Sequence, residues 1–144
     1  PTKEMPLHSA FYALRSAAAG AVVHLHSHHA VLLSLFDEID PEDALPPLTP
    51  YALMQLGRVQ LLPYYRPGDP ALGDAIRALK STTSAVILAN HGPVVAAANL
   101  DRAVFAMEEL EASARLALET RGRSVRGLTR VQIADLVRTF DLNV

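Results

Sequence analysis

The sequence predicts an α/β domain, and two kinds of segment carry that prediction. Residues 21–26 open with three apolar residues and residues 85–89 are apolar throughout, which is typical of buried strands. In residues 4–18 and 100–120, apolar residues recur every three or four positions, as they do in helices that bury one face. Such strands and helices, mixed along one chain, indicate a sheet covered by helices.

The composition fits one globular domain and argues against several classes of partner. The chain has 144 residues, of which 50% are hydrophobic and 19% charged, with a formal net charge of -2. Acidic and basic residues are interspersed, so neither a nucleic-acid surface nor a membrane-binding helix is indicated. No apolar run approaches the roughly 20 residues of a membrane span, and we expect a soluble, cytoplasmic protein. The chain has no cysteine, so any metal site must use imidazole and carboxylate ligands.

The first predicted helix covers residues 4–18, with Thr2 as its cap and Pro6 in its first turn. Glu4 and His8 are four positions apart and share a face, so a carboxylate and an imidazole leave this helix together. The chain starts without a methionine and its helical pattern begins almost at once. We therefore expect it to be the interior of a longer chain.

Residues 21–26 form the next predicted strand and carry the first candidate site. Side chains alternate between the two faces of a strand, so His24 and His26 should point to the same side, about 6.6 Å apart. Two neutral imidazoles so placed can bind one divalent metal ion, and a third ligand would leave a catalytic-type site with an open position. Two isolated histidines at this spacing are also typical of a solvated strand end.

His28 and His29 follow directly, but they are left unassigned. Residues 30–36 are strongly apolar and predict a short buried helix, so the chain should already have turned away from the strand direction. The role of both histidines stays open.

The middle of the chain predicts two helices with a short strand between them. Thr49 and Pro50 have the character of a cap and a first helical residue, and Gly57 should end that helix. Residues 59–62 predict the strand, and residues 70–80 predict the second helix.

Residues 85–89 and 94–97 are apolar runs on either side of a tight turn at residues 90–92, which predicts a hairpin with His91 at its tip. A histidine at a hairpin tip is usually a solvent-facing turn residue unless a site requires it. By itself, His91 therefore predicts no function.

Two capped helices complete the chain. Asn99 should cap a helix over residues 100–120, and Thr129 has capping-box spacing at the start of a helix that ends near residue 139. The expected buried row of the long helix is Leu100, Val104, Met107, Leu110, Ala114 and Leu118. Its expected solvent-exposed face includes Glu108, Glu109 and Glu111.

Three motifs together resemble the class II aldolase/adducin family: Thr2-Lys3-Glu4 with His8, Val22-Val23-His24-Leu25-His26-Ser27, and Asn90-His91-Gly92. The resemblance implies a three-layer α/β/α sandwich around a central, mainly antiparallel sheet. Residues 1–144 would be the larger, C-terminal part of this single domain, and the N-terminal part of the fold would be missing from the chain.

The same resemblance implies a metal site. His24, His26 and His91 would be the ligands of a divalent ion, most often Zn²⁺, with Mn²⁺ or Co²⁺ as alternatives. Glu4 would sit over the metal, as a further ligand and as the general acid/base.

Within the family, the sequence is most similar to the 3-oxo-tetronate 4-phosphate decarboxylase branch. The motifs that carry this resemblance are Val23-His24-Leu25-His26-Ser27, Leu48-Thr49-Pro50-Tyr51, Pro63-Tyr64-Tyr65-Arg66-Pro67-Gly68-Asp69, Ala89-Asn90-His91-Gly92-Pro93-Val94-Val95 and Met107-Glu108-Glu109-Leu110-Glu111. The implied reaction converts a sugar-acid phosphate to dihydroxyacetone phosphate and CO2 through a metal-stabilised enediolate. Tyr51 would donate a proton across a subunit boundary of a homotetramer whose sites lie at the subunit interfaces.

Two other functions stay open. A class II sugar-phosphate aldolase needs the same enediolate, so the metal ligands alone do not separate the two lyases, and the branch motifs favour the decarboxylase. A non-catalytic adducin-like binding module would be expected to lack the three histidines. A cupin-type barrel, which also uses paired histidines, is disfavoured by the long helix over residues 100–120. No phosphate-binding residue is assigned.

Overall fold

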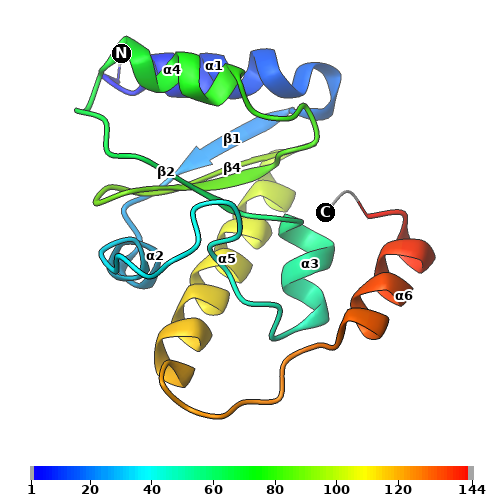
Figure 1. Ribbon diagram of the computed structural model, residues 1–144. Coiled ribbons are helices and arrows are strands. Elements are labelled where there is room, and N and C mark those ends of the chain that lie inside the picture. Colours follow the sequence, from blue (N-terminus) through cyan, green and yellow to red (C-terminus); the bar gives the residue numbers. More distant parts are fainter. Residues whose placement is uncertain (1, 143–144) are drawn as a thin grey trace.

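The computed structural model describes residues 2–142 and has a four-stranded sheet with helices on both faces (Figure 1). The strands are β1 (Ala21–His24), β2 (Gln60–Leu62), β3 (Ala85–Leu88) and β4 (Gly92–Ala97), in the spatial order β1-β4-β3-β2. β4 runs antiparallel to both β1 and β3, whereas β2 and β3 are parallel. The predicted α/β class is confirmed, and the sheet is mixed.

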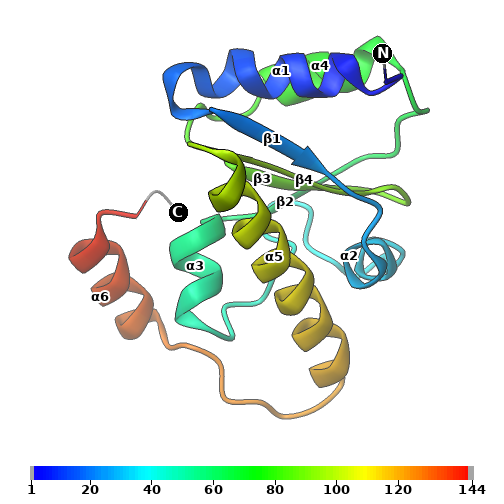
Figure 2. The same cartoon turned by 180° about the vertical axis from the view of Figure 1, so that it is seen from behind.

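The helices form a layer on each side of this sheet (Figures 1 and 2). α1 (Met5–Arg15), which continues into the 3-10 turn η1 (Ser16–Ala18), lies beside α4 (Pro70–Arg77) on one face. α2 (His28–Leu33), α3 (Pro50–Leu56) and α5 (Leu100–Thr120) lie on the other face, and α6 (Arg130–Phe140) packs against α3. None of the helices in residues 2–142 is both long and apolar enough to cross a membrane.

The two layers explain why β3 has no polar face. Val86 and Leu88 pack into the core beneath α1 and α4, whereas Ile87 packs into the core beneath α5. On β4, Val94 and Val95 alternate in the same way. A strand covered on both faces must be apolar at every position, which is the pattern that residues 85–89 show.

The local capping signals place the starts of α3, α5 and α6 correctly, whereas α2 starts at His28, two residues before the predicted start at residue 30. The side chain of Thr49 accepts the backbone N–H of Ala52 at 3.3 Å, and that of Asn99 accepts the N–H of Arg102 at 2.9 Å. Thr129 forms the complete capping box. At the first helix the prediction was wrong by two residues, because Glu4 is the N-cap residue and the hydroxyl of Thr2 accepts the N–H of Glu4 instead.

The predicted buried row of α5 was partly wrong. Leu100 is 62% exposed and Val104 is 40% exposed. The residues that face the sheet and neighbouring helices are Ala103, Ala106, Met107, Leu110, Ser113 and Ala114. A periodicity argument gives weight to large apolar side chains, whereas four of the six buried residues of this helix are alanine or serine, which allow a close approach.

Candidate metal centre

Three imidazoles from two distant segments meet at one end of the sheet. His24 is the last residue of β1, His26 follows two positions later, and His91 lies in the turn between β3 and β4. One ligand nitrogen from each of them lies within 4.8 Å of the other two. The ring centroids are 4.9 to 5.1 Å apart, so all three side chains surround one point.

Strand pairing brings the two segments together. In the β1–β4 register His24 lies opposite Val94, two residues from the hairpin turn. The turn is closed by a hydrogen bond from the N–H of His91 to the carbonyl of Leu88, 3.1 Å long, and Asn90 adopts the left-handed φ of 59°. The antiparallel register thus sets the end of β1 beside the tip that carries His91.

Gly92 permits the close approach of the two segments. A Cβ atom at Gly92 would lie 2.2 Å from the carbonyl oxygen of Leu25 and 3.1 Å from the Cα of His26. The φ of Gly92 is 148°, a conformation that other residues rarely adopt. Any side chain there would push the hairpin tip away from the backbone that carries His26.

The ring of His24 is oriented by a backbone hydrogen bond. Its Nδ1 lies 2.9 Å from the carbonyl oxygen of Pro93, so Nδ1 carries the proton and donates. Nε2 is then an acceptor, and within the described residues it is buried without a hydrogen-bond partner. A buried, unsatisfied acceptor is costly, and a carbonyl on the far nitrogen is the usual second-sphere arrangement of a metal-binding histidine. These features fit a divalent ion.

The electrostatics of two of these histidines, His24 and His91, favour the neutral imidazole. Burial lowers the pKa of His24 below 6.5, and the neighbouring His91 and His26 lower it further, although the Pro93 carbonyl and Glu4 act in the opposite direction. Burial likewise lowers the pKa of His91, against the opposing charge of Glu4. Neutral imidazoles at pH 7 are the form that binds a metal ion.

Glu4 lies beside the cluster without joining it. It is half-buried at the start of α1, and its charge acts on both His24 and His91. In residues 2–142, however, the group of ligand atoms within 4.8 Å of one another contains only the three histidines. The carboxylate of Glu4 is therefore near enough for its charge to act on two of the three histidines, but it is not one of the clustered ligand groups.

Tyr51 is not brought to the histidines within the single chain. It lies in the first turn of α3, which packs against α5 and α6, and it is 61% exposed. It is also absent from the residues that line the hollow at the cluster. A role for Tyr51 at this site therefore requires a second subunit.

An open hollow of about 520 Å³ adjoins the cluster. Its lining residues are His26, His28, Asn90 and His91 together with Val31, Leu32, Leu35 and Pro67. His28 thus reaches the hollow as the first residue of α2. A larger hollow of about 700 Å³, bounded by Arg15, Ala98 and Phe105, lies away from the histidines.

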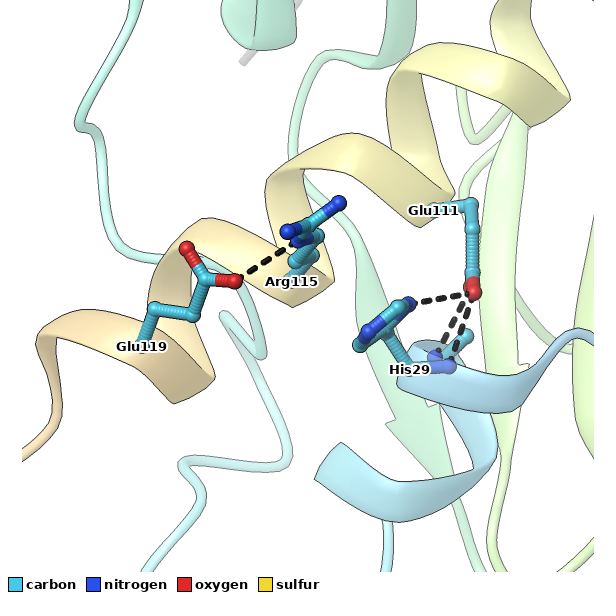
Figure 3. Close-up of polar contacts among 5 residues, drawn as sticks. His29, Glu111, Arg115 and Glu119 are labelled. Carbon is cyan, nitrogen blue, oxygen red and sulfur yellow. Dashed lines mark hydrogen bonds and ion pairs between the residues drawn. The ribbon is translucent and has the colours of Figure 1, made fainter.

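The sequence-based interpretation missed Glu111. Instead of lying on a fully exposed helix face, its carboxylate is 26% exposed and pairs with His29 across two helices, as Figure 3 shows. Helical periodicity places Glu111 on α5 but carries no signal for a partner 82 positions away.

Similarity to known proteins agrees with the geometry. The profile of the Class II Aldolase and Adducin N-terminal domain matches residues 1–118. The 3-oxo-tetronate 4-phosphate decarboxylase of Pectobacterium atrosepticum is 44% identical over 136 residues, which are 94% of this chain and 62% of the relative. The L-fuculose phosphate aldolase of Haemophilus influenzae is 29% identical over 142 residues, which are 97% of this chain and 63% of the relative.

Solved structures give the same picture. The crystal structure of YgbL from Klebsiella pneumoniae is 43% identical with a TM-score of 0.89, and the match covers 94% of this chain and 65% of that one. An L-fuculose 1-phosphate aldolase structure is 26% identical with a TM-score of 0.74, covering 98% of this chain and 64% of that one. The chain thus spans less than two thirds of the length of each of these relatives.

Proposed function

We propose, from the premise that this chain belongs to the class II aldolase and adducin family, that the whole protein is a divalent-metal-dependent decarboxylase. Its substrate is a 3-oxo-tetronate 4-phosphate, and its products are dihydroxyacetone phosphate and CO2. Relatives with that activity in their names are 40% to 47% identical to the chain, whereas the matched aldolases are 29% to 33% identical.

The observation that carries the metal assignment is the buried, unpartnered Nε2 of His24 beside His26 and His91. These three residues hold the ion, with Zn²⁺ as the first choice for neutral nitrogen ligands and Mn²⁺ or Co²⁺ as alternatives. When bound, a divalent cation polarises substrate oxygens and stabilises the negative charge that develops as CO2 leaves.

Glu4 handles the proton. Its carboxylate takes a proton from a substrate hydroxyl or delivers one to the carbon that loses CO2, and it is an additional candidate ligand. The support for this role is its half-buried place at the start of α1 and its charge acting on His24 and His91.

Tyr51 is the second proton donor, supplied by a neighbouring subunit of a homotetramer whose sites lie at the subunit interfaces. Its 61% exposure leaves the side chain accessible to another subunit. Leu25 and Leu35 are also about half exposed, at 47% and 50%, and Leu35 lines the hollow at the cluster. Apolar side chains at such an edge suit burial against a second copy.

The helices on both faces of the sheet support a three-layer α/β/α sandwich in which residues 1–144 form the larger, C-terminal part of a single domain. The share of each relative that the chain covers is consistent with this assignment.

The test is to incubate the whole protein with a 3-oxo-tetronate 4-phosphate and to measure CO2 and dihydroxyacetone phosphate. Equal amounts of both products are expected. If sugar phosphates instead give retro-aldol products without CO2, the protein is an aldolase. A Glu4→Gln variant should lose most turnover while keeping its fold, and full turnover in that variant would remove Glu4 from the mechanism.

A further inference from the structure

The start of α2 is held by a residue from another helix. The first N–H groups of any helix lack partners within it and need an acceptor. Ser27 occupies the N-cap position of α2, but its side chain makes no capping hydrogen bond. The acceptor comes instead from α5.

Glu111 supplies that acceptor. Its Oε1 accepts the backbone N–H of His29 at 2.8 Å, and its Oε2 accepts the backbone N–H of Ala30 at 3.0 Å. The Nδ1 of His29 also lies 2.8 Å from Oε1. Figure 3 shows these contacts converging on one carboxylate, whereas Arg115 on the same helix pairs with Glu119.

The carboxylate is ionised in this position. Burial opposes its ionisation, but the backbone N–H of His29, the nearby Ser27 hydroxyl, the backbone N–H of Ala30 and the His29 ring together hold the pKa of Glu111 below 4.5. A negative charge at a helix start is also favoured by the helix dipole. Glu111 is therefore a strong, charged cap for α2.

His26 lies between this cap and the sheet. It sits in the extended stretch between the end of β1 and the start of α2, and in the described part of the chain its own backbone makes no hydrogen bond. On the β1 side, the stretch is fixed by the N–H of Leu25, which donates to the carbonyl of Pro93 at 3.3 Å. On the α2 side, the fixed points are the two N–H groups held by Glu111.

We propose that Glu111 is a positioning residue for the metal centre: by capping α2 through the backbone N–H groups of His29 and Ala30, it fixes the stretch that carries His26 and so raises the affinity for the ion. This inference rests on the metal site proposed above. Glu111 acts through the backbone, not as a ligand and not mainly through the His29 ring.

The experiment compares Zn²⁺ affinity of the whole protein in five forms, by competition with a chromophoric chelator. They are wild type, Glu111→Gln, Glu111→Asp, His29→Ala and the control Glu108→Gln, which changes an exposed glutamate on the same helix. The metal-free forms are also unfolded with urea, so that each affinity refers to folded protein.

Glu111→Gln should bind Zn²⁺ about 10-fold more weakly, the lower end of the range for partners bonded directly to a ligand, because Glu111 itself contacts no ligand. Glu111→Asp, which keeps the charge but shortens the side chain, should show a smaller loss. His29→Ala should lose less than Glu111→Gln because both backbone caps remain, and Glu108→Gln should stay within about two-fold of wild type.

Wild-type affinity in folded Glu111→Gln and Glu111→Asp overturns the proposal, even if both variants are less stable, because the role would then be structural only. A loss in His29→Ala as large as that in Glu111→Gln also overturns it, by assigning the effect to the ring. If wild type itself binds no Zn²⁺, Mn²⁺ or Co²⁺, both the metal centre and this inference fail.

Discussion

The two ends of the β1–β4 pair are built alike and carry different residues. At one end, a Cβ on Gly20 would lie 2.1 Å from the carbonyl oxygen of Ala98; at the other, a Cβ on Gly92 would lie 2.2 Å from that of Leu25. Both glycines therefore allow two backbones to touch. Only the Gly92 end is surrounded by imidazoles, whereas small apolar residues of β4 adjoin the Gly20 end.

Both ends of the strand pair bring two backbones into contact, so this contact does not by itself create a site. Within residues 2–142, only the side chains near the Gly92 end can bind a metal ion. The Gly20 end joins η1 to the sheet. There the backbone N–H of Gly20 donates a hydrogen bond to the carbonyl of Ala97 at 2.8 Å. The Gly92 end sets His26 against the turn that carries His91. Perturbing each end separately should therefore separate stability from metal binding.

The largest effect is expected from His24→Ala, which removes the ligand at the Gly92 end whose Nε2 is buried without a partner. Affinity for Zn²⁺ should fall by more than about 100-fold, beyond the range for outer-sphere partners. Metal analysis of the purified whole protein should then drop from one ion per subunit to nearly none. His8→Ala, outside the cluster on α1, is the matched control and should keep its ion.

Gly92→Ala and Gly20→Ala form the direct comparison of the two ends. Each forces a methyl group against a carbonyl oxygen, so each should lower the free energy of unfolding by about 1 to 3 kcal/mol. Only Gly92→Ala should also weaken Zn²⁺ binding, by about 10-fold or more, because it displaces His91 from His26. Urea unfolding and chelator competition measure the two quantities, and equal metal affinities in the two variants would contradict the comparison.

A pH series tests the cap beside the Gly92 end. Because the pKa of Glu111 lies below 4.5 in the folded state, the unfolded chain takes up the proton first as the pH falls. The stabilisation is therefore complete above the unfolded pKa and is lost as the pH falls through the folded pKa. In urea unfolding without metal at pH 7, the free energy of unfolding of wild type should exceed that of Glu111→Gln by about 1 to 2 kcal/mol. This difference should become smaller below about pH 4.5. A gap independent of pH would refute the charged cap.

The smallest effect is expected from Thr129→Ala, which removes the capping box of α6. The free energy of unfolding should fall by about 0.5 to 1 kcal/mol, because α6 buries no residue fully and packs mainly on α3. Zn²⁺ affinity should not change, since no residue of α6 belongs to the histidine cluster or lines the hollow beside it. A change in affinity would show that the metal centre responds to general loss of stability.

Local signals predicted most of the elements. Thr49, Asn99 and Thr129 each cap a helix through a partner three residues away, so the sequence nearby contains the whole interaction. The alternation of β-strand side chains also placed His24 and His26 together. These predictions depend on spacing within a few residues.

What the spacing could not predict depends on partners far along the chain. His91 joins His24 only through the β1–β4 register, and without the family resemblance its hairpin turn predicted no function. The contact of Glu111 with α2 bridges 81 to 82 positions and has no periodic signature. Leu100 is likewise exposed although it fits the apolar repeat of α5, because the packing of the whole fold decides which face of the helix is buried.

The hydrogen bond from His24 to Pro93 joins residues 69 positions apart, and it has a consequence for the order of folding. Contacts of such long range form late, because a large loop must close before they contribute. The β3–β4 hairpin joins neighbouring segments of the chain, but the three imidazoles meet only when β1 pairs with β4. A metal ion that binds this centre should therefore leave the folding rate almost unchanged and slow unfolding, so that it lengthens the lifetime of the native state.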